Sequence, residues 1–157
     1  MRINKKLLII CILIPLLVGG LSALLTGNSM ESFSTLNKPS FAPPAWLFPV
    51  AWTVMYTLMG VSSYLILTSV APKEDKESAL KIYAIQLSVN FLWSIFFFNL
   101  ELYLFAFFWL LLLWGLVLVM LVRFYKINKT AAFINVPYIV WLTFATVLNF
   151  TIWLLNN

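Results

Sequence analysis

Residues 102–123 read LYLFAFFWLLLLWGLVLVMLVR, and this stretch reaches its first charged side chain only at Arg123. An α-helix needs about 20 apolar residues to cross a hydrocarbon core of ~30 Å. The rest of the chain has the same character, because 63% of its 157 residues are hydrophobic and only 10% are charged. A soluble domain is about half apolar and about a quarter charged. The sequence therefore predicts an integral membrane protein.

Four further apolar runs of similar length flank this stretch, and we expect each to form a helix. The five predicted spans are residues 7–26, 46–70, 80–98, 102–123 and 131–155. A membrane β-barrel would instead show alternating strands of ~10 residues, which the sequence lacks. The first run follows a basic segment, as in a signal peptide, but it is longer than the usual ~7–15 apolar residues and no A-x-A-like site follows. We expect an all-α bundle of five uncleaved spans that forms a single domain, residues 1–157.

The basic residues lie almost entirely on one side of this predicted bundle. That side carries Arg2, Lys5, Lys6, Lys73, Lys76, Lys81, Arg123, Lys126 and Lys129, whereas the other side carries Lys38. By the positive-inside rule the N-terminus should be cytoplasmic and the C-terminus outside, in the cell membrane. The net charge of +5 then indicates contact with anionic lipid and not nucleic-acid binding. Glu74, Asp75 and Glu77 share the loop after the second span with lysines, which is typical of a solvated turn.

Several kinds of chemistry are excluded by the residues that the chain lacks. There is no histidine, the commonest metal ligand and general base. The single cysteine, Cys11, lies within an apolar run, where it is expected to be a small packing residue. No charged side chain falls in the middle of a span, which argues against a voltage sensor or a carboxylate proton relay. We therefore predict no metal site and no acid–base site in the membrane interior.

Uncharged polar and aromatic side chains share helical faces in two of the spans. Gln86, Asn90 and Trp93 lie on one face of the third span, and Trp52 and Tyr56 are four residues apart in the second. Buried amides need hydrogen-bond partners. Either they bond to a neighbouring helix and hold the bundle together, or they face a cavity and bind the polar edge of a ligand. The aromatic residues likewise fit a plain core, an interfacial belt or a pocket wall.

Two more stripes have the same four-residue spacing. One lies in the fifth span and comprises Pro137, Trp141, Ala145 and Asn149. The other lies in the first span and consists of the small residues Gly19, Ala23 and Gly27. Small residues so spaced let helices approach closely. The sequence leaves open whether this happens within one chain or across a homodimer.

The segment KPSFAPPAWLFPVAW, residues 38–52, joins the long loop 27–45 to the second span. Proline fixes φ near −65° and biases the preceding residue away from helix. With Pro39, Pro43 and Pro44 in this segment, we expect a stiff lid over one end of the bundle. Trp46 is expected to anchor the lid junction at the interface, and Trp52 to point into a cavity below it.

Three blocks of the chain together resemble the TspO/MBR family of tryptophan-rich sensory proteins and translocator proteins. The blocks are LNKPSFAPPAW…AWTVMY at 36–56, QLSVNFLWSIFF at 86–97 and PYIVWLTFATVLN at 137–149. The resemblance implies a five-helix bundle with a cavity near the first long loop. It also implies binding of porphyrins, such as protoporphyrin IX and haem, and of isoquinoline or benzodiazepine drugs, with a sensory or regulatory role in tetrapyrrole or stress responses.

Mapped by motif, the resemblance assigns residues to the pocket and to the lid. The implied pocket residues are Trp52, Tyr56, Gln86, Asn90, Trp93, Trp141, Ala145 and Leu148, and the implied lid residues are Pro43, Pro44 and Trp46, beside Lys38 and Pro39. The resemblance implies that no cofactor is required and that the porphyrin is the ligand. The alternatives are an enzyme that degrades protoporphyrin in light, with Trp52 and Trp141 as catalytic candidates, and a transporter of porphyrin or lipid.

The chain departs from the family pattern at two places. Ser32 and Phe33 stand where many members have Trp-Tyr, so one aromatic wall of the implied pocket is lost. The sterol motif that is proposed at the C-terminus lacks its tyrosine, since Phe150 stands there, and no basic residue follows. Specific sterol binding is therefore not predicted. Lys38 is the single cation on its side, and we expect it to pair with the porphyrin propionates.

Overall fold

The computed structural model describes residues 3–157, and the regular structure in that range is helical. The elements are α1 (Lys5–Leu25), α2 (Ser29–Thr35), α3 (Leu47–Leu67), α4 (Lys73–Ser94), the π-helix η1 (Ile95–Asn99), α5 (Tyr103–Ile127), α6 (Lys129–Ile134) and α7 (Val136–Asn156). Five helical segments are long and apolar enough to cross a membrane: α1, α3, α4 with η1, α5, and α6 with α7. The predicted all-α fold with five spans is confirmed.

The third span begins earlier than the sequence suggested, at Lys73 and not near residue 80. Glu74 and Asp75 lie in the first turn of α4, where carboxylates interact favourably with the helix dipole. Lys73 and Glu77 form an i,i+4 ion pair of 3.5 Å on the same turns. The prediction that these acidic residues form a turn is wrong, because the helix continues into the solvent and its charged turns are exposed.

The last span also differs from its predicted form, since it is broken at Asn135 into α6 and α7. The side-chain amide of Asn135 donates to the hydroxyl of Ser62 on α3 (2.6 Å) and to the Ala131 carbonyl (3.0 Å). The Ser62 hydroxyl in turn donates to the same carbonyl (2.7 Å). The hydrogen bonds at this break therefore hold the start of the fifth span against α3.

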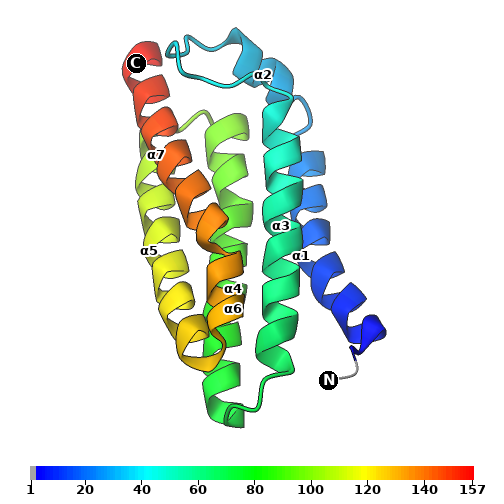
Figure 1. Ribbon diagram of the computed structural model, residues 1–157. Coiled ribbons are helices and arrows are strands. Elements are labelled where there is room, and N and C mark those ends of the chain that lie inside the picture. Colours follow the sequence, from blue (N-terminus) through cyan, green and yellow to red (C-terminus); the bar gives the residue numbers. More distant parts are fainter. Residues whose placement is uncertain (1–2) are drawn as a thin grey trace.

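The spans pack side by side in an elongated bundle (Figure 1). Helix α1 packs on α3, α4 packs on α5, α5 packs on α7, and α6 reaches α3. The described N-terminal end lies at one end of the bundle with the α3–α4 and α5–α6 connections, whereas α2 and the C-terminus lie at the other (Figure 1). The lysines and arginines from Lys5 to Lys129, apart from Lys38, therefore gather at the first of these ends; Arg2 lies outside the described residues.

Helices α1 and α3 approach each other closely at Gly60, which is buried. A Cβ at this position would collide with the α1 backbone at Ile12 and with the Cys11 carbonyl. Further along α1, at Gly19, the ring of Tyr56 takes the place that a side chain would need. Past this point the space between the two helices is not filled by side chains, and a cavity begins.

Candidate functional site: an aromatic cavity beneath α2

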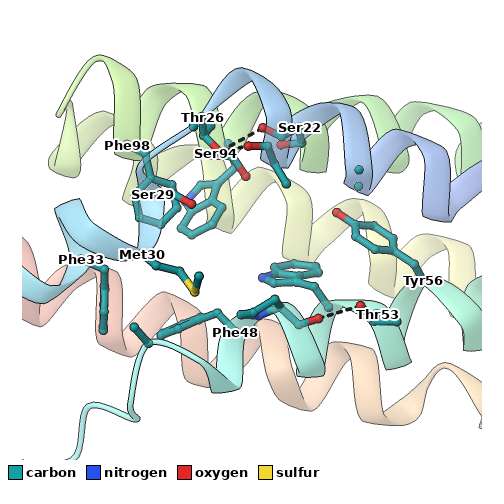
Figure 2. A pocket seen from close by; sticks show the side chains of 18 of the residues that line it. Ser22, Thr26, Ser29, Met30, Phe33, Phe48, Thr53, Tyr56, Ser94 and Phe98 are labelled. Atoms are coloured by element: carbon teal, nitrogen blue, oxygen red, sulfur yellow. Dashed lines mark hydrogen bonds between the residues drawn. The ribbon is translucent and has the colours of Figure 1, made fainter.

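A cavity of about 370 Å³ lies between the second half of α1, helix α2, the start of α3 and the junction of α4 with η1. Figure 2 shows hydroxyl-bearing residues, among them Ser22, Thr26, Ser29 and Ser94, on one side of it. Phe33, Met30 and Phe48 lie on the other side, and Tyr56 is at the far end (Figure 2). None of the described residues that line the cavity is charged. The cavity is thus apolar and aromatic, with one hydroxyl-rich wall.

Trp52 lines the cavity and is held in place by other aromatic rings. Its indole stacks on Tyr56, with centroids 5.5 Å apart and planes 27° apart. It meets the rings of Tyr138 (6.3 Å) and Trp141 (6.5 Å) edge to face. Offset-stacked and edge-to-face pairs are the preferred aromatic geometries. Trp52 is therefore a fixed wall of the cavity.

Trp93 lines the cavity from the α4 side and is oriented by hydrogen bonds. Its indole N–H donates to the side-chain oxygen of Asn149 on α7 (3.2 Å). The Asn149 amide donates to the Tyr103 carbonyl at the start of α5 (2.8 Å). Three spans thus set the position of one indole ring.

The predicted pocket amides, Gln86 and Asn90, do not line this cavity, and both are buried in the bundle. The Tyr56 hydroxyl donates to Asn90 (3.1 Å), the Asn90 amide donates to the Tyr138 hydroxyl (2.7 Å), and Tyr138 donates to Gln86 (2.8 Å). The Gln86 amide lies 3.8 Å from the Met59 sulfur. These contacts join α3, α4 and α7. Of the two alternatives given above, both amides thus adopt the first and bond to neighbouring helices. Tyr56 links the network to the cavity wall.

The predicted residues of α7 also lie away from the cavity lining. Trp141 packs behind Trp52 and against Phe48 (5.9 Å), and its buried indole nitrogen has no hydrogen-bond partner within residues 3–157. Ala145 and Leu148 belong to the buried core. Of the eight residues assigned by motif, the structure brings Trp52, Tyr56 and Trp93 to the cavity.

The predicted lid contains a helix that the sequence did not indicate, α2, and Phe33 of this helix lines the cavity. Phe33 is buried, and its ring meets Phe48 at 4.8 Å. Phe33 thus partly replaces the aromatic wall that the Trp-Tyr pair of many family members would supply.

The residues assigned to the lid lie around the cavity and do not line it. They are Lys38, Pro39, Pro43, Pro44 and Trp46. Trp46 is 62% exposed. From this segment Ala45, Phe48 and Pro49 contribute to the lining. The second span, α3, begins at Leu47, one residue after its predicted start at residue 46.

The lysine of the lid contacts its own helix. The Lys38 ammonium donates to the carbonyls of Phe33 (2.9 Å) and Ser34 (2.7 Å) and lies 5.1 Å above the Phe33 ring. These carbonyls are at the C-terminal end of α2, where cations are favoured. Lys38 therefore caps α2, and it does not itself line the cavity.

Sequence reasoning missed the α1 wall, because the small residues there were treated only as packing positions. Gly19, Ala23 and Gly27 line the cavity with Gly20, Ser22 and Thr26. Their four-residue spacing puts them on one face, and the absence of bulk on that face leaves the space that the cavity occupies. The stripe therefore forms one wall of the cavity.

Several polar groups of the cavity wall are not used within the protein. Within residues 3–157, the Ser22 hydroxyl donates to the Phe91 carbonyl (3.4 Å) and that of Thr26 to the Ser22 carbonyl (2.9 Å). The hydroxyls of Ser29 and Ser94 and the indole N–H of Trp52 donate no hydrogen bond to any residue of this range. Three donors are thus available to a bound molecule. The described residues contain no cluster of three His, Cys, Asp or Glu side chains that could hold a metal ion.

The fold and this cavity define a helical integral membrane protein with an uncharged aromatic pocket at one end of a five-span bundle. The model of the TspO/MBR family matches residues 11–154, and the chain belongs to that family. Membership supports a role as a membrane receptor.

Relatives are found in bacteria and in mammals. A tryptophan-rich protein TspO of Chlorobaculum tepidum is 35% identical over 98% of this chain and 99% of its own length. A tryptophan-rich sensory protein of Cereibacter sphaeroides is 37% identical over 80% of this chain and 77% of its own. The human translocator protein is 33% identical over 83% and 78%. The likeness thus extends over most of both chains in each pair.

Proposed function

We propose that the chain is a membrane receptor whose cavity binds a flat, largely apolar aromatic molecule, of the porphyrin or the isoquinoline and benzodiazepine classes. The observation that carries this proposal is the uncharged cavity, walled by Trp52, Trp93, Phe33 and Phe48, with unused donors on its rim. Pockets for small molecules are mostly apolar with a few placed polar groups, and have volumes of ~300–1,000 Å³. The cavity meets each of these conditions.

Given the size of the cavity, we expect the two ligand classes to differ in how they fit. A two-ring drug fits a space of about 370 Å³, near the lower limit of ligand pockets. A tetrapyrrole is wider, so we expect α2 and the loop after it to move outward when it binds. Protoporphyrin IX and haem would then bind with their propionates toward the opening under α2. Because the chain has no histidine, the metal-free ring should bind at least as well as haem.

We propose a sensory role in the tetrapyrrole or stress response, and the name of the Cereibacter relative, a tryptophan-rich sensory protein, supports it. We propose the cell membrane as its place. The end of the bundle that carries Lys5 and Lys129 would face the cytoplasm, according to the positive-inside rule. The C-terminus and α2 would then lie outside.

The test replaces one wall residue and a matched tryptophan outside the cavity. In Trp52→Ala, affinity for protoporphyrin IX and for an isoquinoline drug should fall about tenfold, because one aromatic contact and its buried area are lost. In Trp46→Ala both affinities should stay unchanged. Ligand absorbance, followed in a titration, measures binding without relying on the fluorescence of the altered tryptophan. Equal losses in the two variants, or no saturable binding to the unaltered chain, would contradict the proposal.

A second candidate function is light-dependent breakdown of bound protoporphyrin. It is favoured by the contact of Trp52 with Tyr56 and Trp141, because connected rings beside an excited porphyrin can supply electrons. Illumination in air should bleach protoporphyrin faster with the chain than with Trp52→Phe/Trp141→Phe at equal bound ligand. Equal bleaching rates would contradict the enzymatic function and would not affect the proposed receptor function.

A further inference from the structure

A second hollow lies at the opposite end of the bundle from the aromatic cavity (Figure 1). It is a groove of about 900 Å³ between the loop after α3, the first turns of α4 and the last turns of α5. Its lining residues are Val70, Ala71, Pro72, Asp75, Ser78, Leu118, Val119, Val122, Arg123, Lys126 and Ile127. None of these residues takes part in the aromatic cavity.

The outer part of the groove is basic. Arg123 and Lys126 line it from adjacent turns of α5, and Asp75 is the one carboxylate in the lining, so cations outnumber anions two to one. The Arg123 guanidinium donates to the Ser78 hydroxyl on α4, which holds it against the wall. Among residues 3–157, one ion pair is formed, between Lys73 and Glu77. Arg123 and Lys126 therefore have no carboxylate partner among these residues. A guanidinium has five N–H donors and suits a phosphate.

The inner part of the groove is apolar and continues along α5 into the membrane-spanning segment. Val122, Val119 and Leu118 are between 42% and 50% exposed. Arg123 and Leu118 are five residues apart, which is about 7.5 Å along a helix axis. Because the predicted apolar span ends at Arg123, we expect the cations at the boundary of the membrane and the apolar track to run from them toward its middle.

We propose that this groove is a binding site for an anionic phospholipid. The phosphate-bearing headgroup would lie between Arg123, Lys126 and Ser78, and an acyl chain would lie along Val122, Val119 and Leu118. Two features select this occupant: the excess of positive charge at the membrane boundary, and the apolar track directly below it. Basic pockets between spanning helices are a known way to hold acidic lipid headgroups. A free phosphate ion would use the outer part alone.

The test measures lipid binding to the full chain in a neutral detergent, by native mass spectrometry. Phosphatidylglycerol and phosphatidylcholine with the same acyl chains are titrated against the unaltered chain and the variants Arg123→Gln, Lys126→Gln and Lys81→Gln. Lys81 is an exposed lysine at the same end that does not line the groove. We expect the unaltered chain to prefer phosphatidylglycerol. Each groove variant should bind it about fivefold more weakly, and Lys81→Gln should bind it as the unaltered chain does.

Three outcomes would overturn the proposal. They are an equal loss in Lys81→Gln, no preference between the two lipids, and displacement of phosphatidylglycerol by inorganic phosphate alone, which would indicate a site for a free anion. A further variant, Val122→Asn, keeps both cations and places an amide on the apolar track. It should weaken binding of long-chain but not of short-chain phosphatidylglycerol; equal effects on both would remove the acyl-chain part of the site. Drug binding in the aromatic cavity should be unchanged in all variants, which shows that each is folded.

Discussion

At Gly19 the backbone of α1 passes against the ring of Tyr56, which stacks on Trp52 and bonds to Asn90. A methyl group there would force the ring out of its place. Overpacking of this kind typically costs ~1–3 kcal/mol. We therefore expect Gly19→Ala to lower both the thermal stability of the chain and its affinity for an isoquinoline drug.

A glycine of α5 supplies the matched control. A Cβ at Gly115 would meet no heavy atom within 4 Å, and Gly115 does not line the cavity. Gly115→Ala should be neutral or stabilise the helix by about 0.5–1 kcal/mol. A melting curve and a drug titration on the two variants decide the matter. Similar behaviour of both would show that the ring of Tyr56 does not depend on Gly19.

Lys38 is a residue for which structure and sequence lead to different predictions. As the one cation on its side, it was expected to pair with propionates, so Lys38→Gln would weaken porphyrin binding alone. In the structure its ammonium caps the carbonyls of Phe33 and Ser34. Loss of the cap should loosen α2, which holds Phe33 over the cavity, at a cost of ~1–3 kcal/mol.

We therefore expect Lys38→Gln to weaken a neutral isoquinoline and protoporphyrin by similar factors, as measured by titration of each. The conservative variant Lys38→Arg, which keeps the charge, should recover part of the affinity. A loss restricted to protoporphyrin would restore the propionate pairing and contradict the capping role.

At the scale of elements, the lid is tied to the end of α7 by two asparagines. The Asn37 N–H donates to the side-chain oxygen of Asn156 (3.0 Å), and the Asn156 amide donates back to the Asn37 carbonyl (2.8 Å). A separate bond, outside the lid, joins the Asn99 amide of η1 to the Leu25 carbonyl of α1 (3.0 Å). The Asn37–Asn156 pair helps to explain how a proline-rich loop can be an ordered cover.

Asn156→Ala should loosen the lid without reaching the cavity wall. Exposed hydrogen bonds contribute about 0.5–1.5 kcal/mol each, so we expect faster hydrogen exchange in residues 36–45. On our proposal that protoporphyrin binding involves outward movement of the lid, protoporphyrin should also associate faster. Asn157→Ala, at the adjacent exposed position, is the control. Unchanged exchange in Asn156→Ala would show that the asparagine pair does not hold the lid.

At the scale of the whole molecule, hydrophobic run length was enough to predict the five spans, since each run must match the membrane. The ends were harder to predict. Helix α4 extends to Lys73 because its first turns gain from charge placement in water, an effect that hydrophobicity does not report. The break at Asn135 depends on its bonds to Ser62 and Ala131, which join residues far apart in the chain.

The candidate site could be predicted only in part for the same reason. Helical spacing identified Trp52 with Tyr56, and it placed Trp93 on a face with Gln86 and Asn90. Spacing cannot tell which neighbour a face meets, however. The two amides meet Tyr138 of α7 and become part of the core, whereas the wall opposite Trp52 comes from α1. That wall is defined by small side chains, which carry no chemical signal of their own.

The most direct test of the central claim is the experimental structure of the chain with a bound isoquinoline drug. The geometry predicts the ligand between α1 and α3, in contact with Trp52, Trp93 and Phe33 and with the Ser22–Thr26 turn of α1. A ligand placed against Ala145 and Leu148 of α7, with α1 closed onto α3, would contradict it.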